Sequence, residues 1–223
     1  MAITGTTIET MSPSTQQQLA LAERHFRARQ YEPAEELLLR IVAASPKVPK
    51  AWELLAYISG NRGELDACEE RLLKATALPG CSAEALFYLG RVQLQNGRGR
   101  EATISFERSI QLAGEYFEGL HELAVAHSAI GEHALALRAL QRAEKKNPHS
   151  PELHANMANT LSELQRHEEA LQHYDRALAL NPRLARTWAD RGFALSALGR
   201  ESQALESYER ALGLAPQDVY TWM

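Results

Sequence analysis

A spacing of 34 residues runs through this chain from Thr15 to Asp218 without an insertion or a deletion. The eighth position of each segment is small, and it holds Ala22, Ala56, Gly90, Ala124, Ala158 and Gly192. The twentieth position is small as well, and it holds Ala34, Cys68, Ala102, Ala136, Ala170 and Ala204. A fixed period of this length predicts an array of stacked units rather than a globule around one core.

Each segment has the pattern of two helices. Large apolar and small residues recur twice at helical spacing, on either side of a short polar turn. Glycine lies in that turn in four segments, at Gly63, Gly97, Gly131 and Gly199. Four segments close with proline, at Pro46, Pro148, Pro182 and Pro216. Because proline cannot continue a helix, we expect each segment to be one hairpin of two helices of about 14 residues.

The spacing resembles that of the tetratricopeptide repeat. The resemblance is clearest in the run from Trp188 to Leu195, which is followed by Gly199, Ala204, Tyr208, Ala211 and Pro216. It covers six units of 34, or 204 of 223 residues. It implies an all-α fold, namely a right-handed superhelical α-solenoid of stacked antiparallel helix hairpins.

The period also predicts the domain boundaries. We expect a flexible leader at residues 1–14, an array at 15–218, and the start of a seventh unit or a truncated tail at 219–223. The six repeats are 15–48, 49–82, 83–116, 117–150, 151–184 and 185–218. Trp222 occupies the fourth position of the incomplete unit. Because such arrays usually end in a capping helix, we expect this chain to be a fragment of a longer protein, and a short native tail is the alternative. Without a capping helix, we expect the C-terminal face of the sixth repeat to associate with another copy.

Composition limits the classes of partner. The net charge of −4 disfavours general binding to nucleic acid, which needs a concentrated basic face. No run of about 18 apolar residues predicts a membrane span. The N-terminus lacks a basic region followed by an apolar core, so we expect no secretory signal and a cytoplasmic location.

Few residues have the spacing of a chemical site. The glycine-rich run 96–100 lacks the Gly-Lys-Ser/Thr ending of a phosphate loop. His121 and His127 are too far apart for the zinc spacing His-Glu-x-x-His. Glu118, His121 and Glu122 share one helical face, which leaves a weak divalent site as an alternative, and the other histidines scatter over unrelated positions. We therefore predict no enzymatic activity, no cofactor and no metal.

The resemblance places function in a concave groove that is lined by the first helix of each hairpin and binds an extended peptide or helix. By resemblance, the groove positions are 2, 5, 6, 9, 12 and 13 of each repeat. The candidates at these positions are Tyr57, Phe87, Tyr88, Arg91, His121, Glu122, Asn156, Asn159, Arg186, Asp190 and Phe193. Aromatic rings, arginine and amides are enriched where partners dock. The alternatives are a solvated helix surface for the amides and arginines, and packing between repeats for the rings.

Two functions remain open. The chaperone-binding carboxylate clamp of this family is excluded, because Asp190 has the wrong charge for it and only Asn156 matches its pattern. We predict a scaffold that binds a protein or peptide in the groove. As the alternative, the last two repeats look like bacterial arrays that precede a glycosyltransferase or sulfotransferase domain, which implies a substrate-recognition arm of a larger enzyme.

Overall fold

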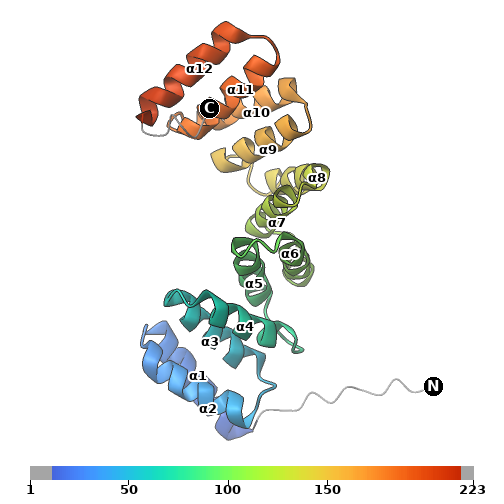
Figure 1. The fold of residues 1–223 in the computed structure, drawn as a ribbon. Helices are drawn as coiled ribbons and strands as arrows, with labels where there is room; N and C mark the ends of the chain where they lie inside the picture. Colours follow the sequence, from blue (N-terminus) through green and yellow to red (C-terminus); the bar gives the residue numbers. More distant parts are fainter. Residues whose placement is uncertain (1–11, 217–223) are drawn as a thin grey trace, which may run out of the picture. The chain divides into compact units, whose positions relative to one another are not determined.

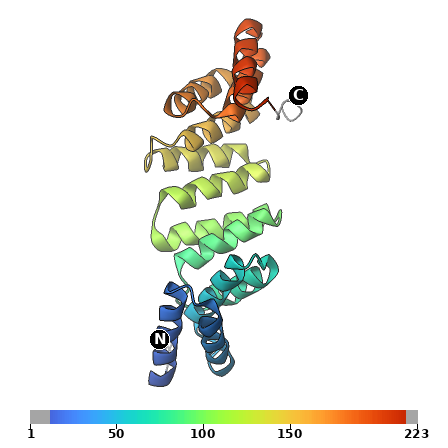
Figure 2. The same cartoon turned by 90° about the vertical axis from the view of Figure 1, so that its left-hand side faces the viewer.

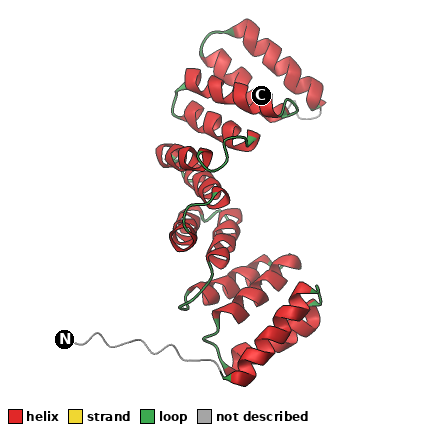
Figure 3. Ribbon diagram, turned by 180° about the vertical axis from the view of Figure 1, so that it is seen from behind, coloured by secondary structure: helices red, strands yellow, loops and turns green. Residues whose placement is uncertain are grey.

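The computed structural model describes residues 12–216, and these residues form twelve α-helices and no strand (Figures 1 and 3). The expected all-α repeat fold is therefore confirmed. The helices are α1 (Pro13–Arg27), α2 (Tyr31–Ala44), α3 (Pro49–Asn61), α4 (Leu65–Thr76), α5 (Ala83–Gln95), α6 (Gly99–Ala113), α7 (Phe117–Ala129), α8 (His133–Glu144), α9 (Pro151–Glu163), α10 (His167–Leu180), α11 (Ala185–Ala197) and α12 (Glu201–Leu214).

Local chemistry explains where the helices begin. Ser82 and Ser150 are N-caps, and their side chains accept hydrogen bonds from the backbone N–H groups of Ala85 at 3.0 Å and Leu153 at 3.1 Å. These bonds satisfy donors that a helix leaves unpaired at its start. Proline occupies the first turn of α1, α3 and α9, where its missing N–H is not needed.

Every hairpin turns through one left-handed residue at the fifteenth position of the repeat. The residues and their φ angles are Arg29 at 58°, Gly63 at 77°, Gly97 at 74°, Gly131 at 78°, Gln165 at 60° and Gly199 at 71°. Glycine adopts this conformation without a steric penalty, whereas Arg29 and Gln165 adopt it with a Cβ atom. The first and fifth hairpins therefore keep the turn without the glycine that signals it in the sequence.

The helices form two compact units. The N-terminal unit is residues 1–96 and the C-terminal unit is residues 97–223, so the boundary lies inside the third repeat, between α5 and α6. In the N-terminal unit, α1 pairs with α2 and α3 pairs with α4, while α2 contacts α3 and α4 contacts α5. Leu38, Ile41, Leu55 and Ile58 are fully buried between these hairpins.

The C-terminal unit holds three complete hairpins: α7 with α8, α9 with α10, and α11 with α12. Contacts between α8 and α9 and between α10 and α11 join successive hairpins, and α6 packs on α7 (Figure 2). The first helices also touch one another, α7 against α9 and α9 against α11. This succession gives the unit a continuous face of first helices.

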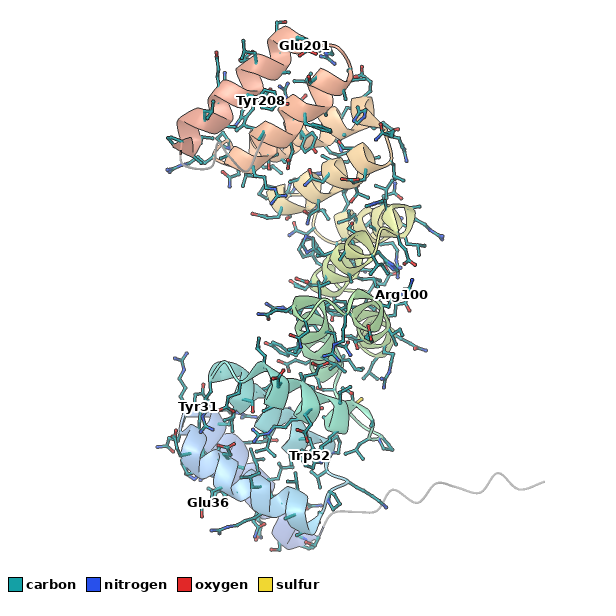
Figure 4. All side chains as sticks on the ribbon, in the orientation of Figure 1. Tyr31, Glu36, Trp52, Arg100, Glu201 and Tyr208 are labelled. Atoms are coloured by element: carbon teal, nitrogen blue, oxygen red, sulfur yellow. The ribbon has the colours of Figure 1, made fainter. Side chains whose placement is uncertain are left out.

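The small positions of the period are packing positions. Ala34, Ala102, Ala136 and Ala170 are all 0% exposed. Gly192 shows why size matters: a Cβ atom there would lie 2.6 Å from the ring of Tyr208, labelled on α12 in Figure 4. A contact that short would force the Tyr208 ring to move, so a larger side chain at position 192 would disturb the packing of α12 on α11.

Parts of the predicted ends lie outside the described residues. Helix α1 begins at Pro13 with Ser12 as its cap, so it includes the last two residues of the expected leader. Residues 1–11 of the leader, the tail at 219–223 and Trp222 lie outside residues 12–216. Among the helices within that range, none combines the length and the apolar character needed to cross a membrane.

Candidate functional site

The candidates in the N-terminal unit form a chain of aromatic contacts. The ring of Tyr57 on α3 lies 5.1 Å from that of Tyr88 and 6.3 Å from that of Phe26 on α1. Phe87 on α5 lies 6.0 Å from Tyr88, edge to face. Tyr88 keeps 37% of its surface exposed and Arg91 is exposed. The rings of Phe26, Tyr57 and Tyr88 therefore pack between successive repeats, and Tyr88 and Arg91 remain accessible to a partner.

Carboxylates around Tyr57 have a structural role. Burial raises the pKa of the Tyr57 phenol far above its ordinary value, and the charges of Glu84 and Glu53 act in the same direction. Glu53 is only 1% exposed; it accepts hydrogen bonds from the Ser82 backbone N–H at 2.7 Å and from Lys50 Nζ at 3.2 Å. Glu53 thus holds Ser82, the N-cap of α5, in place. Glu53 itself occupies position 5 of its repeat, which is one of the predicted groove positions.

The candidates in the C-terminal unit are joined by polar contacts. Asn156 Nδ2 on α9 lies 2.8 Å from His121 Nε2 on α7, and the His121 ring stacks on Phe117 at 5.8 Å. Because an amide nitrogen only donates, we assign His121 Nε2 as the acceptor. These contacts hold His121 in place, and the described residues show no cluster of metal-ligand atoms at Glu118, His121 and Glu122.

Asn159 connects α9 to two further elements. Its Oδ1 accepts a hydrogen bond from the Tyr174 hydroxyl at 2.6 Å. It also hydrogen-bonds to Asp190 on α11, whose carboxylate lies 3.8 Å from Arg186 Nε. Burial raises the pKa of Asp190 and outweighs the opposing effects of Arg186 and Asn159. Arg186 is exposed, so its charge is screened by solvent and compensates Asp190 only in part.

A pocket of about 260 Å³ opens beside these amides. Its walls come from α7, α8 and α9, and it is lined by Ala124, Val125, Ser128, His133, Leu140, Asn156, Asn159, Thr160 and Glu163. The lining mixes apolar side chains with amide, hydroxyl and carboxylate groups. Such a combination of apolar walls and a few polar groups is typical of binding pockets.

The structure brings together some candidates and not others. Tyr57, Phe87 and Tyr88 form one group, and His121 pairs with Asn156. Asn159, Asp190 and Arg186 form another. Arg91 is exposed at the surface of α5, and Phe193 on α11 is 63% exposed. Phe193 is therefore an apolar side chain that is open to solvent.

Sequence reasoning missed a cluster in the C-terminal unit. His154 on α9 and His173 on α10 lie with their Nδ1 atoms 3.3 Å apart, and Glu144 Oε1 lies 3.9 Å from His154 Nδ1. The prediction that the remaining histidines scatter was wrong for this pair, because helix packing brings positions 4 and 23 together. Burial lowers the pKa of His173. The available signal was the histidine at position 4, where the second and sixth repeats carry tryptophan.

The paired helices and their first-helix faces define an all-α repeat protein, and family comparison identifies the repeat. Three family models described as tetratricopeptide repeat match residues 15–58, 121–185 and 157–220. The chain therefore contains tetratricopeptide repeats, as its 34-residue spacing predicts. The link to glycosyltransferase or sulfotransferase arrays has no support among these matches.

Solved structures share the fold at low sequence identity. MamA is 20% identical with a TM-score of 0.69, over 74% of this chain and 97% of that one. YrrB, described as a TPR protein with an unusual peptide-binding site, is 20% identical with a TM-score of 0.70, over 81% and 93%. A curated mouse protein, Superkiller complex protein 3, is 28% identical over 111 residues, which is 50% of this chain and 7% of the mouse protein.

Proposed function

We propose that this chain is a protein-interaction scaffold, and that the first-helix face of its C-terminal unit binds an extended segment of another protein. That face consists of the groove positions of α7, α9 and α11. The observation that carries the proposal is the pair Asn156 and Asn159 on the wall of the 260 Å³ pocket. YrrB, which has the same fold, is itself described as having a peptide-binding site.

The amides suit a peptide backbone. Each asparagine side chain has a donor and an acceptor, and so does each peptide unit of an extended segment. Asn156 directs its Nδ2 to His121, and Asn159 bonds to both Tyr174 and Asp190. A peptide would therefore use the second N–H and the second lone pair that each amide retains, together with the Oδ1 atom of Asn156. The partners that fix these side chains reduce the conformational entropy lost on binding. The two amides thus bind the backbone and the pocket receives a side chain.

Residues on α11 supply specificity. Exposed Arg186 offers a charge-assisted hydrogen bond to an acidic side chain or a terminal carboxylate. Phe193 offers an exposed ring for an apolar side chain. We therefore expect the preferred segment to combine an acidic residue with an apolar one, and to be bound without chemical change.

Peptide display tests this proposal. Random peptides are selected on the intact chain, and the affinity of the selected sequence is measured by fluorescence anisotropy. The variant Asn156→Ala/Asn159→Ala/Arg186→Glu is expected to bind at least about tenfold more weakly, because central contacts of an interface contribute 1 kcal/mol or more each. The matched control Arg138→Glu/Gln172→Ala changes exposed residues of the second helices and should keep the wild-type affinity. Equal affinities of both variants would contradict the proposed face.

Two further predictions have their own tests. A gene that encodes an α/β domain with nucleotide-sugar or sulfate-donor motifs after Met223 would support the transferase arm, and a stop codon there would exclude it.

Self-association is supported by exposed Leu205, Leu212 and Leu214 on α12. Light scattering after size-exclusion chromatography should show a dimer that Leu205→Glu/Leu212→Glu converts to a monomer.

A further inference from the structure

A second polar cluster lies where the fourth and fifth repeats meet. Glu144 ends α8, His154 lies in the first turn of α9 and His173 lies in the middle of α10. One ligand atom from each residue lies within 4.8 Å of the other two. These contacts involve none of the residues of the proposed peptide-binding face.

The tautomer of His154 follows from its partner. His154 Nε2 lies 3.0 Å from the carbonyl oxygen of Pro148, which only accepts hydrogen bonds. The array repeats this contact with tryptophan: Nε1 of Trp52 donates to the Pro46 carbonyl at 2.8 Å, and Nε1 of Trp188 donates to the Pro182 carbonyl at 2.9 Å. His154 Nε2 therefore carries the proton, and the lone pair of a neutral His154 is on Nδ1. A metal-binding histidine is commonly oriented in this way, with its second N–H donated to a carbonyl.

The spacing of the two imidazoles fits a metal ion. Zinc binds histidine nitrogen at about 2.0–2.1 Å with tetrahedral geometry, which places two ligand nitrogens about 3.3–3.4 Å apart. The Nδ1 atoms of His154 and His173 are 3.3 Å apart. Glu144 Oε1 lies 3.9 Å from His154 Nδ1 and within 4.8 Å of the ligand atom of His173, so it moves toward the two nitrogens to become the third ligand. Glu144 and His173 are only partly buried, so an ion can enter from solvent.

The period shows that these residues are exceptional. Glu144, His154 and His173 occupy positions 28, 4 and 23 of their repeats. The same positions hold Ile110, Leu120 and Ala139 one junction earlier, and Leu178, Trp188 and Ser207 one junction later. Packing of hairpins therefore does not require ionisable groups here. His154 is nevertheless 3% exposed, and both of its ring nitrogens are engaged, Nε2 with the Pro148 carbonyl and Nδ1 with His173.

We propose that Glu144, His154 and His173 bind one Zn²⁺ ion, with water in the fourth position. On binding, the proton of His173 moves from Nδ1 to Nε2, which frees the Nδ1 lone pair. Arg176 Nη1 lies 3.6 Å from Glu144 Oε1 and is the cation that zinc displaces. Arg176 is 58% exposed, so its side chain moves into solvent without loss of packing. The ion then crosslinks α8, α9 and α10.

Zinc titration of the intact chain tests the site. The protein is prepared without a histidine tag, treated with chelator, and titrated with ZnCl₂ by isothermal calorimetry. One zinc ion per chain and a higher melting temperature with zinc are expected. Co²⁺ in place of zinc should give the visible absorption of a tetrahedral site. An absence of zinc binding by the wild type would overturn the proposal.

The array supplies matched variants. His173→Ser and His154→Trp introduce residues that other repeats carry at the same positions, so they remove ligands and keep side chains that the fold accepts. Each should weaken zinc binding by at least about a hundredfold. Mutation of residues that only hydrogen-bond to a metal ligand already lowers metal affinity by about 10–100-fold, and these variants remove a ligand itself. Glu144→Gln provides a third variant if circular dichroism shows that either of the others is unfolded. His25→Ala, a histidine of the N-terminal unit, should leave binding unchanged. Wild-type affinity in the ligand variants would show that zinc binds elsewhere and would reject this site.

Discussion

The first-helix faces of the two units have the same spacing but different chemistry. In the N-terminal unit, the rings of Phe26, Tyr57 and Tyr88 contact one another. In the C-terminal unit, the fifth repeat carries amides at the positions of Tyr88 and Tyr57, namely Asn156 and Asn159, beside a pocket. A repeat period therefore fixes where side chains lie and leaves open whether they are used for stability or for binding. We expect the aromatic face to contribute mainly to stability and the amide face mainly to binding.

The two units also differ in how they hold a carboxylate. In the N-terminal unit, Glu35 accepts hydrogen bonds from Arg62 at 2.6 Å and Arg71 at 3.2 Å. Burial raises the pKa of Glu35, but the two arginines outweigh burial and hold that pKa below its ordinary value. In the C-terminal unit, burial of Asp190 prevails and raises its pKa. Acid should therefore change the stabilising contributions of Glu35 and Asp190 in opposite directions.

The largest effect is expected from the aromatic face. Tyr57→Ala should lower the free energy of unfolding by about 2–3 kcal/mol, somewhat less than the loss of a fully buried aromatic ring. Asn156→Ala in the C-terminal unit should cost less than about 1 kcal/mol. Urea denaturation gives both values, and hydrogen exchange shows whether the Tyr57 effect stays in the N-terminal unit. If the two variants lose equal free energy of unfolding, the aromatic and amide faces do not differ in their contribution to stability.

The small packing positions should behave alike in both units. Ala170→Leu and Ala34→Leu each add three carbon atoms at a fully buried site and should cost about 1–3 kcal/mol through overpacking. The damage should be confined to adjacent hairpins, because repeats couple mainly to their neighbours. Thermal melts together with hydrogen exchange measure both features. If neither variant is destabilised, the assignment of the twentieth position to helix packing is wrong.

Opposite pH dependences provide a smaller effect. Because the pKa of Glu35 is lowered, its stabilisation is present above the ordinary value of 4.5 and is lost as the pH falls through the folded-state pKa. Glu35→Gln should therefore cost about 0.5–1 kcal/mol at neutral pH and nothing in strong acid. The raised pKa of Asp190 has the opposite effect on stability. Because burial disfavours the charged carboxylate, stability is lost as the pH rises above the ordinary value of 3.8 and Asp190 ionises. Asp190→Asn should remove that loss. Parallel pH profiles for the two variants, measured by denaturation, would refute this contrast.

The smallest effect concerns the hairpin turns. Gln165→Gly should stabilise the protein by about 0.5 kcal/mol. The change removes the steric cost of a Cβ atom in the left-handed conformation, about 1–2 kcal/mol. The greater conformational entropy of glycine in the unfolded chain offsets about 0.5–1 kcal/mol of that gain. Arg29→Gly is the matched change in the N-terminal unit and should have the same sign. Conversely, Gly131→Gln should destabilise its hairpin. Chemical denaturation distinguishes these outcomes, and stabilisation by Gly131→Gln would contradict the role given to the turn.

The helices were predictable from the sequence, whereas the polar clusters were not. Alternation of large and small residues predicts the hairpins, and Pro148 and Pro182 mark where successive units separate. Arginine and glutamine are not residue types that indicate a left-handed turn. Only the alignment of Arg29 and Gln165 with the glycines of the other repeats indicates it. The unit boundary at residue 97 was also not predictable, since the period continues through it unchanged.

The groove and the histidine cluster show the same limit. Position numbers place Asn156 and His121 on first helices, but their hydrogen bond depends on how α7 meets α9. His154 and His173 are 19 residues apart and Glu144 belongs to the preceding repeat. The two histidines meet because α9 packs on α10 within one hairpin, and Glu144 joins them across a repeat junction. A search for spacing within one helix detects neither contact. Whether the eleven groove candidates bind a partner remains a prediction that the peptide experiment tests.

The single left-handed residue in each hairpin leaves little spare chain between the two helices, so the helix lengths set the register of the array. One amino acid added inside a helix would turn every later residue of that helix by about 100°, because each residue of an α-helix advances by that angle. Alanine and tyrosine side chains that now meet the neighbouring helix would then point elsewhere. A whole added hairpin of 34 residues would instead repeat every interface in register.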